Sequence, residues 1–168
     1  MTKQNLESIF IEHLEKHQDM VFKIARIYAP SPDDKDDLVQ EILFQAWRSF
    51  KDFRMESKFS TWLYRVALNT ALTATRFYKK RKLEIHNGDN TMDFPSPAYQ
   101  PDQTEEIELL YAAIRKLKPI ERGIILLYLE EKSYKEISEV MGITSSNVSV
   151  RIVRIKTRLQ EMLKSKLK

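Results

Sequence analysis

Residues 133–159 read SYKEISEVMGITSSNVSVRIVRIKTRL, and this stretch predicts two short amphipathic helices joined by a tight turn. The first helix repeats apolar residues at helical spacing, namely Ile137, Val140 and Met141. Gly142 supplies the permissive backbone that the turn needs, and Thr144 or Ser145 can cap the helix that follows. The stretch is therefore typical of a helix-turn-helix motif.

The second helix of this motif has one apolar side and one polar side. Its apolar stripe consists of Val148, Ile152, Ile155 and Leu159. On or beside the opposite side lie Ser146, Asn147, Ser149, Val150, Arg151 and Arg154. Short polar groups come first and arginines follow, an order typical of a recognition helix whose first turns enter a major groove. The alternative is an ordinary helical hairpin with a solvated cationic face.

The composition indicates a folded chain without a membrane span. With 168 residues, 42% of them hydrophobic, the chain has enough apolar surface for one ordinary domain or two small ones. No run approaches the roughly 18 to 20 apolar residues of a transmembrane helix, and the first residues lack the apolar core of a secretion signal. The absence of cysteine excludes disulfides, thiolate metal sites and cysteine nucleophiles. We therefore expect a cytoplasmic protein.

The charges are unevenly distributed along the chain. Residues 1–83 carry 15 Lys and Arg against 11 Asp and Glu, and residues 112–168 carry 13 against 6. Residues 84–111, which lie between these two blocks, carry no Lys or Arg but 7 Asp and Glu. The two basic blocks suit contact with a polyanion, which would repel the acidic segment.

The first basic block predicts three helices. Apolar periodicity indicates helices over residues 6–28, 38–50 and 60–82. The second is preceded by the acidic run 33–37, which lacks the glycine and closing glutamate of a calcium-binding loop. We interpret these acids as N-caps and as charges that favour the start of the helix, so no metal site is predicted.

Two segments of this block combine aromatic and cationic residues. Residues 53–64 contain four aromatic residues beside Arg54 and Lys58, a combination that can stack unpaired bases along a phosphate backbone. Core packing is the alternative for some of these rings. Residues 76–82 form a cluster too dense in charge to be buried, which suits contact with the nucleic acid backbone.

The domain organisation follows from the loss of periodicity in the middle of the chain. Residues 84–104 contain an Asn-Gly-Asp-Asn run and three prolines and are interpreted as a flexible acidic linker. The predicted fold is therefore all-α, with two small helical domains at residues 1–83 and 105–168.

The order of these parts resembles the sigma-70 superfamily of bacterial transcription initiation factors, in particular the small extracytoplasmic-function type with only regions 2 and 4. Residues 36–47 resemble the region that binds the clamp of RNA polymerase. Residues 59–69 are similar to the stretch that opens and reads the minus-ten element, and residues 134–158 to the motif that reads the minus-thirty-five element. Ser138 stands in place of the usual alanine, and Ser149-Val150 in place of a basic residue followed by serine.

The resemblance implies three groups of binding residues. The polymerase-binding group is Asp36, Asp37, Leu38, Gln40, Glu41, Phe44, Gln45 and Trp47. The minus-ten group is Phe53, Arg54, Lys58, Phe59, Trp62, Tyr64, Arg65, Asn69, Arg76, Lys79, Lys80 and Arg81. The minus-thirty-five group is Tyr134, Lys135, Thr144, Ser145, Ser146, Asn147, Ser149, Val150, Arg151, Arg154 and Arg158.

The resemblance also implies the partners of the chain. These are core RNA polymerase, promoter DNA both as duplex and as melted non-template strand, and an anti-sigma factor, which the family often has. We expect no catalytic residues, cofactor, metal or small-molecule substrate. Three alternatives are a helix-turn-helix regulator that works without polymerase, a nuclease that uses residues 33–37 with Mg²⁺, and a helical adaptor that binds only proteins.

Overall fold

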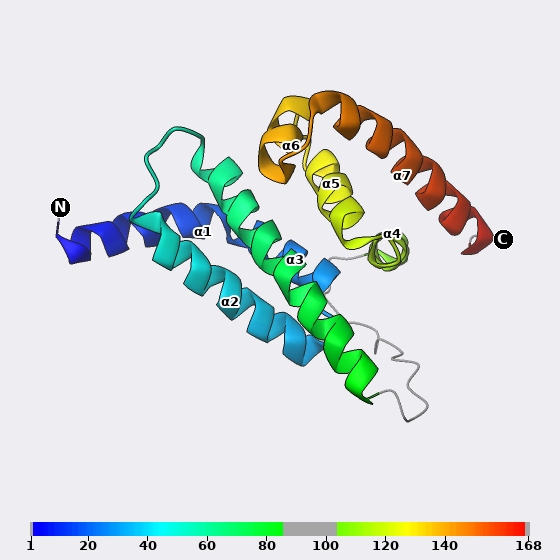
Figure 1. Cartoon of the computed structure of the whole chain (residues 1–168), viewed down its shortest axis with the longest axis horizontal. Coiled ribbons are helices and arrows are strands. Elements are labelled where there is room, and N and C mark those ends of the chain that lie inside the picture. The colour runs from blue at the N-terminus through cyan, green and yellow to red at the C-terminus, as the bar shows by residue number, and fades with distance from the viewer. Residues whose placement is uncertain (1, 86–103, 167–168) are drawn as a thin grey trace. The chain divides into compact units, whose positions relative to one another are not determined.

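The structure, a computed structural model, describes residues 2–85 and 104–166 of the chain. Within these residues it contains seven helices and no strand, which confirms the predicted all-α class (Figure 1). The chain divides into a first unit, Met1–Asn90, and a second unit, Thr91–Lys168. The predicted linker, residues 84–104, lies mostly outside the described residues. No described helix is long and apolar enough to cross a membrane.

The first unit consists of three helices, α1 (Lys3–Tyr28), α2 (Pro32–Phe50) and α3 (Phe59–Ile85), each packed on the other two. Its core is formed by fully buried aliphatic side chains, among them Ile24, Ile27, Leu38, Ile42, Leu63 and Leu68. Ile24, Leu38, Ile42 and Leu63 belong to the apolar pattern that predicted these helices, whereas Ile27 and Leu68 are buried outside that pattern. Burial of the stripes is the main force that holds the three helices together.

Helix α2 begins earlier than its apolar pattern. Ser31 is its N-cap, because the Ser31 side chain accepts a hydrogen bond from the Asp34 backbone N–H at 3.1 Å. Pro32 occupies the first turn, where its missing N–H costs nothing. The acidic side chains that follow interact favourably with the positive end of the helix dipole, as predicted. The expectation that these acids are themselves the N-cap was wrong, because Ser31 is the cap.

The second unit consists of α4 (Glu105–Arg115), α5 (Pro119–Leu129), α6 (Tyr134–Met141) and α7 (Ser145–Lys166). Helix α7 packs on the other three, and its stripe of Val148, Ile152, Ile155 and Leu159 is buried as predicted. Pro119 lies in the first turn of α5, where its missing N–H costs nothing.

The turn between α6 and α7 has the geometry of a helix C-cap followed by an N-cap. Gly142 adopts the left-handed conformation with φ of 70°, and its N–H donates to the Ser138 carbonyl at 2.9 Å. The Ser138 hydroxyl donates to the Ile143 carbonyl within the same turn. Thr144 caps α7 by accepting from the Asn147 N–H at 3.1 Å. Ser138 therefore gives the turn a hydrogen bond that an alanine could not provide.

Candidate protein and nucleic-acid interfaces

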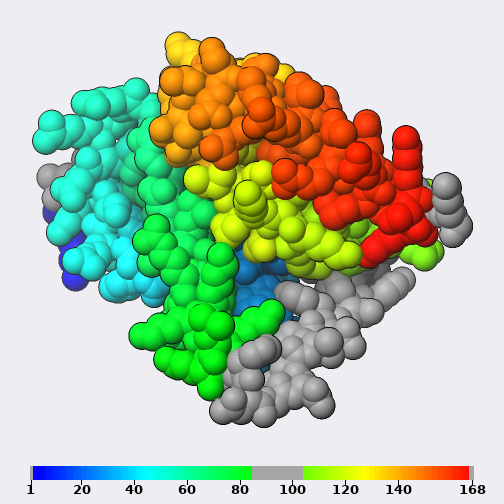
Figure 2. Space-filling view, turned by 45° about the vertical axis from the view of Figure 1, so that its right-hand side comes forward, coloured from blue at the N-terminus to red at the C-terminus, as the bar shows by residue number. Residues whose placement is uncertain are grey.

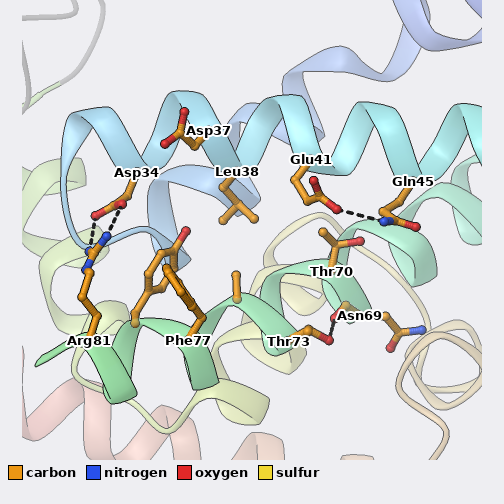
Figure 3. Close-up of a pocket in the computed structure, with 12 residues that line it drawn as sticks. Asp34, Asp37, Leu38, Glu41, Gln45, Asn69, Thr70, Thr73, Phe77 and Arg81 are labelled. Atoms are coloured by element: carbon orange, nitrogen blue, oxygen red, sulfur yellow. Dashed lines mark hydrogen bonds and ion pairs between the residues drawn. The ribbon is translucent and has the colours of Figure 1, made fainter. Parts of the chain in front are cut away.

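A groove of about 800 Å³ runs between α2 and α3 of the first unit. Its α2 side is lined by Asp34, Asp37, Leu38, Glu41 and Gln45. Its α3 side is lined by Asn69, Thr70, Thr73, Ala74, Phe77, Tyr78 and Arg81. Figure 3 shows Asp34 and Arg81 meeting at one end of the groove, while Glu41 and Gln45 follow along α2 toward the other end. The α2 side therefore carries the acidic groups, and Arg81 on the α3 side is paired with Asp34 at one end.

Most of the predicted polymerase-binding residues lie on the outer side of α2. The exposed ones are Asp36, Asp37, Gln40, Glu41 and Phe44. Gln45 is partly exposed and donates through Nε2 to the Glu41 carboxylate at 2.8 Å. Phe44 is 55% exposed and is flanked by polar groups. This side of α2 therefore combines acidic groups with one large apolar side chain.

Two residues of this predicted group serve the fold. Leu38 is only 2% exposed and belongs to the core, so it has little surface to offer a partner. Trp47 is partly buried, and its ring packs on Phe10 of α1 with centroids 5.2 Å apart. Both residues hold α2 in place beneath its exposed side.

Arg81 and Asp34 form an ion pair at one end of the groove. The two terminal nitrogens of Arg81 donate to the two carboxylate oxygens of Asp34 at 2.9 and 2.7 Å. These hydrogen bonds lower the pKa of Asp34 and raise the pKa of Arg81. Burial, together with the charge of Asp34, raises the pKa of neighbouring Tyr78. Arg81, predicted as a DNA contact, thus has a partner within the protein.

The aromatic residues before and at the start of α3 form a packed cluster. Phe50, Phe53, Phe59 and Trp62 lie with ring centroids 5.0 to 6.2 Å apart. Phe59 is buried, and so is Tyr64 nearby, although both were predicted to contact unpaired bases. Phe53 and Trp62 are partly exposed. The alternative of core packing therefore accounts for part of this aromatic segment.

Two histidines of α1 complete the cluster. His13 stacks on Phe59 with centroids 4.9 Å apart, and His17 lies 5.5 Å from the same ring. The two histidines are four residues apart, which puts them on one face of the helix. Within the described residues, no three histidine or carboxylate side chains are grouped as they would be around a metal ion. The pair thus serves to position Phe59.

The other residues of the predicted minus-ten group are polar or basic and lie at the surface. The exposed ones are Arg54, Lys58, Arg65, Asn69, Arg76, Lys79 and Lys80. Near the end of α3, Phe77 is also largely exposed, with the Arg81 guanidinium 5.8 Å from its ring centroid. The first unit thus offers cations at both ends of α3.

The outer side of α7 carries most of the predicted minus-thirty-five group, and Figure 2 shows part of this helix (orange to red) uncovered at the surface. The exposed residues of the motif are Tyr134, Lys135, Thr144, Ser145, Ser146, Asn147, Val150, Arg154 and Arg158. Ser149 and Arg151 are partly exposed. Arg151 donates through Nε to the Asn147 side-chain oxygen at 2.8 Å, so these two residues hold each other in place.

Arg158 differs from the other arginines of α7 because it is paired within the second unit. It donates to the Glu121 carboxylate at 2.8 Å, and the same carboxylate accepts from the Lys118 backbone N–H at 3.3 Å. This interaction links α7 to the start of α5. Sequence reasoning missed this pair and the Asp34–Arg81 pair, because their partners are far apart in the chain. The four-residue spacing of His13 and His17 indicates that they share one face of α1, but their contact with Phe59 depends on tertiary packing.

Two family models match the chain. Residues 13–81 match sigma-70 region 2, and residues 107–159 match sigma-70 region 4. The first match includes most of α1–α3 and the groove, and the second includes the helix-turn-helix.

Individual relatives agree with these matches. The chain is 32% identical over 165 residues to an extracytoplasmic-function RNA polymerase sigma-E factor of Haemophilus influenzae, covering 92% of this chain and 85% of that protein. It is 26% identical over 162 residues to RNA polymerase sigma factor NccH of Alcaligenes xylosoxydans xylosoxydans, covering 93% and 87%. The fold is also similar to that of the sigma factor RpoE of Bartonella quintana, solved with the anti-sigma factor NepR. The TM-score is 0.76 at 24% identity, covering 92% of this chain and 96% of that one.

Proposed function

The chain belongs to the sigma-70 family of RNA polymerase sigma factors, in its extracytoplasmic-function group, and we propose that it directs core RNA polymerase to specific promoters. It acts as an initiation factor with no catalysis of its own, in the cytoplasm, where polymerase and DNA meet. The observation that carries the proposal is the exposed side of α2, because a regulator that binds only duplex DNA has no need of such a surface.

On α2, we propose that Phe44 is the apolar anchor of the polymerase contact. Large aromatic side chains at the centre of an interface contribute much of its binding energy, and flanking polar groups add specificity. Phe44 meets this description because it is half exposed and lies beside the hydrogen-bonded Glu41–Gln45 pair. Asp36, Asp37 and Gln40 would form the polar rim.

For the minus-ten element, the surface around the start of α3 would bind the melted non-template strand. Arg54, Lys58 and Arg65 supply positive charge, and the partly exposed rings of Phe53 and Trp62 lie within the same segment. Stacking of an unpaired base on such a ring is worth about 1 to 3 kcal/mol, which offsets part of the cost of opening the duplex. The buried Phe59 supports this surface from beneath.

We propose the remaining roles by extension from the family and, for the connecting segment, from its acidic charge. Residues 1–83 would form region 2, residues 105–168 region 4, and residues 84–104 the connection between them, whose acids would follow a basic path in the polymerase. The helix-turn-helix would read the minus-thirty-five element. The relative from Bartonella quintana was solved with an anti-sigma factor, which supports the proposal that this chain also has such an inhibitor.

Run-off transcription with purified core polymerase and genomic templates tests the function, and mapping of the start sites identifies the promoters. The matched pair of variants is Phe44→Ala on α2 and Phe22→Ala on α1, because the two phenylalanines are similarly exposed, at 55% and 47%. We expect Phe44→Ala to weaken binding to core polymerase at least tenfold, and Phe22→Ala to leave it unchanged. Equal effects of the two variants would contradict the assignment of α2.

Two controls separate the rival functions. A gel-shift with promoter duplex but no polymerase should show only weak, salt-sensitive binding, because tight specific binding at physiological salt would favour a self-sufficient regulator. A nuclease that depends on Mg²⁺ would cleave DNA without polymerase and stop in chelator. If the chain bound core polymerase but transcription did not depend on the promoter, the chain would be an adaptor that binds only proteins.

A further inference from the structure

Two valines on α7 are exposed without a structural reason. Val150 is 49% exposed and Val153 is 62% exposed, although the apolar stripe of the same helix is buried. Valine is also a weak helix former, because its branched side chain loses freedom against the preceding turn. Neither the core nor helix propensity therefore explains these two side chains.

The position of Val150 on the helix is specific. Helical spacing of about 100° per residue puts Val150 opposite the buried stripe, at the middle of the outer face. Ser146, one turn earlier, is short and exposed, and Arg154 lies one turn later. An apolar side chain thus stands at the centre of this face, with a small neighbour on the side toward the helix N-terminus.

Two arginines lie next to Val150 on the helix. Arg151 follows it directly and is held by Asn147 at 2.8 Å. Arg154 is exposed. The occupant of this face must therefore be negatively charged at its edges and present an apolar group at its centre. Duplex DNA meets this condition where a thymine places its C5 methyl group in the major groove between two phosphate backbones.

We propose that Val150 selects thymine at one position of the upstream promoter element by contact with the thymine methyl group. The inference rests on the proposed function, because it requires α7 to lie in the major groove. Val153 lies about 4.5 Å farther along the helix axis, away from the N-terminal turns that enter the groove most deeply. It is thus the matched comparison for Val150.

The test uses the complete chain with core polymerase. The preferred upstream element is first selected from duplexes randomised in that region, and each thymine of the selected element is then replaced by deoxyuridine, which removes only the methyl group. We expect one replacement to weaken binding of the unaltered protein about fourfold, the effect of one buried methyl group. The same replacement should have no effect on Val150→Ala, and a reduced effect on Val150→Thr, which keeps one methyl group.

The comparison variant makes the outcome decisive. Val153→Ala should show the same sensitivity to deoxyuridine as the unaltered protein. The inference is overturned if no thymine is sensitive, if Val150→Ala keeps the full sensitivity, or if only Val153→Ala loses it. Failure of the proposed function would look different, because no element would then be selected with polymerase at all.

Discussion

Arg81, near the end of α3, is joined to Asp34, in the first turn of α2, by two hydrogen bonds of 2.9 and 2.7 Å between residues 47 positions apart. Asp34 also accepts from the Ser31 hydroxyl at 2.8 Å, so one carboxylate connects the cap of α2 with the end of α3. The pair is only partly exposed, with 12% of the Asp34 side chain and 32% of the Arg81 side chain accessible. It therefore holds the end of α3, which carries the basic segment 76–82, against the start of α2.

Asp34→Asn should lower the free energy of unfolding of the chain by about 1 to 2 kcal/mol, because it removes a charge-assisted pair that is partly screened by water. The measurement is urea unfolding of the two proteins. Asp37→Asn, a neighbouring exposed acid of the same helix, is the matched control and should change stability by less than about 0.5 kcal/mol.

The contribution of Asp34 should also depend on pH. Its pKa is lowered from the ordinary value of 3.8, chiefly by the hydrogen bonds from Arg81, so the folded state binds the proton less tightly than the unfolded state. The stabilisation is fully present above pH 3.8 or so and is lost as the pH falls through the lowered pKa. The difference between wild type and Asp34→Asn should therefore shrink below about pH 4. A constant difference down to pH 2 would contradict this assignment.

Arg81 and Lys80 should affect DNA binding differently. Lys80 is exposed, and Lys80→Gln should weaken promoter binding by the polymerase complex uniformly and reduce the salt slope by about one. Arg81→Gln should mainly lower stability, with a smaller change in slope, because the Arg81 charge is already paired with Asp34. Filter binding across a salt series measures both. A larger change in slope for Arg81→Gln would mean that DNA displaces Asp34.

The arginines of α7 offer a similar contrast. Arg154→Ala should cost about 1 to 3 kcal/mol of promoter binding if it contacts a base edge, or reduce the salt slope if it contacts a phosphate. Arg158→Gln should cost less than about 1 kcal/mol of stability and leave promoter affinity nearly unchanged, because Arg158 is paired with Glu121. Glu121→Gln should lower stability as Arg158→Gln does. The promoter affinities of Arg154→Ala, Arg158→Gln and Glu121→Gln measure this contrast. A loss of affinity in Arg158→Gln as large as that in Arg154→Ala would contradict it.

Gly142→Ala should destabilise the second unit by about 1 kcal/mol. The cause is the backbone alone, since φ is 70° and an added Cβ would meet no atom within 4 Å. Gly142→Asn should cost less, because asparagine tolerates the left-handed conformation. Thermal unfolding monitored by circular dichroism measures both, and equal losses would show that strain is not the cause.

The fold could be predicted from the sequence because its stripes follow helical periodicity. Val148, Ile152 and Ile155 are buried where the pattern put them, and Gly142 forms the turn. These features depend on interactions between near neighbours, which a pattern of three to four residues records.

The candidate site was predicted less completely because exposure depends on tertiary packing. The same segment supplies the buried Phe59 and the partly exposed Phe53, and no local pattern separates the two rings. The pairing of Arg81 with Asp34 depends on how two helices meet, so the cluster 76–82 looked uniformly available in the sequence. The family resemblance predicted which positions bind DNA, but it did not indicate that Arg81 and Arg158 are paired with carboxylates of the same protein.

The packing of Phe10 has a consequence for anyone who shortens this chain. The region 2 match begins at residue 13, which suggests a convenient place to start a minimal fragment. Phe10, however, contacts Trp47 and Phe50 with ring centroids 5.2 and 5.1 Å away. A fragment that begins at residue 13 would lack Phe10. The rings of Trp47 and Phe50 would then be more exposed, and exposed apolar surface promotes aggregation. The packed core of the first unit therefore begins before residue 13, and a shortened protein should retain the whole of α1.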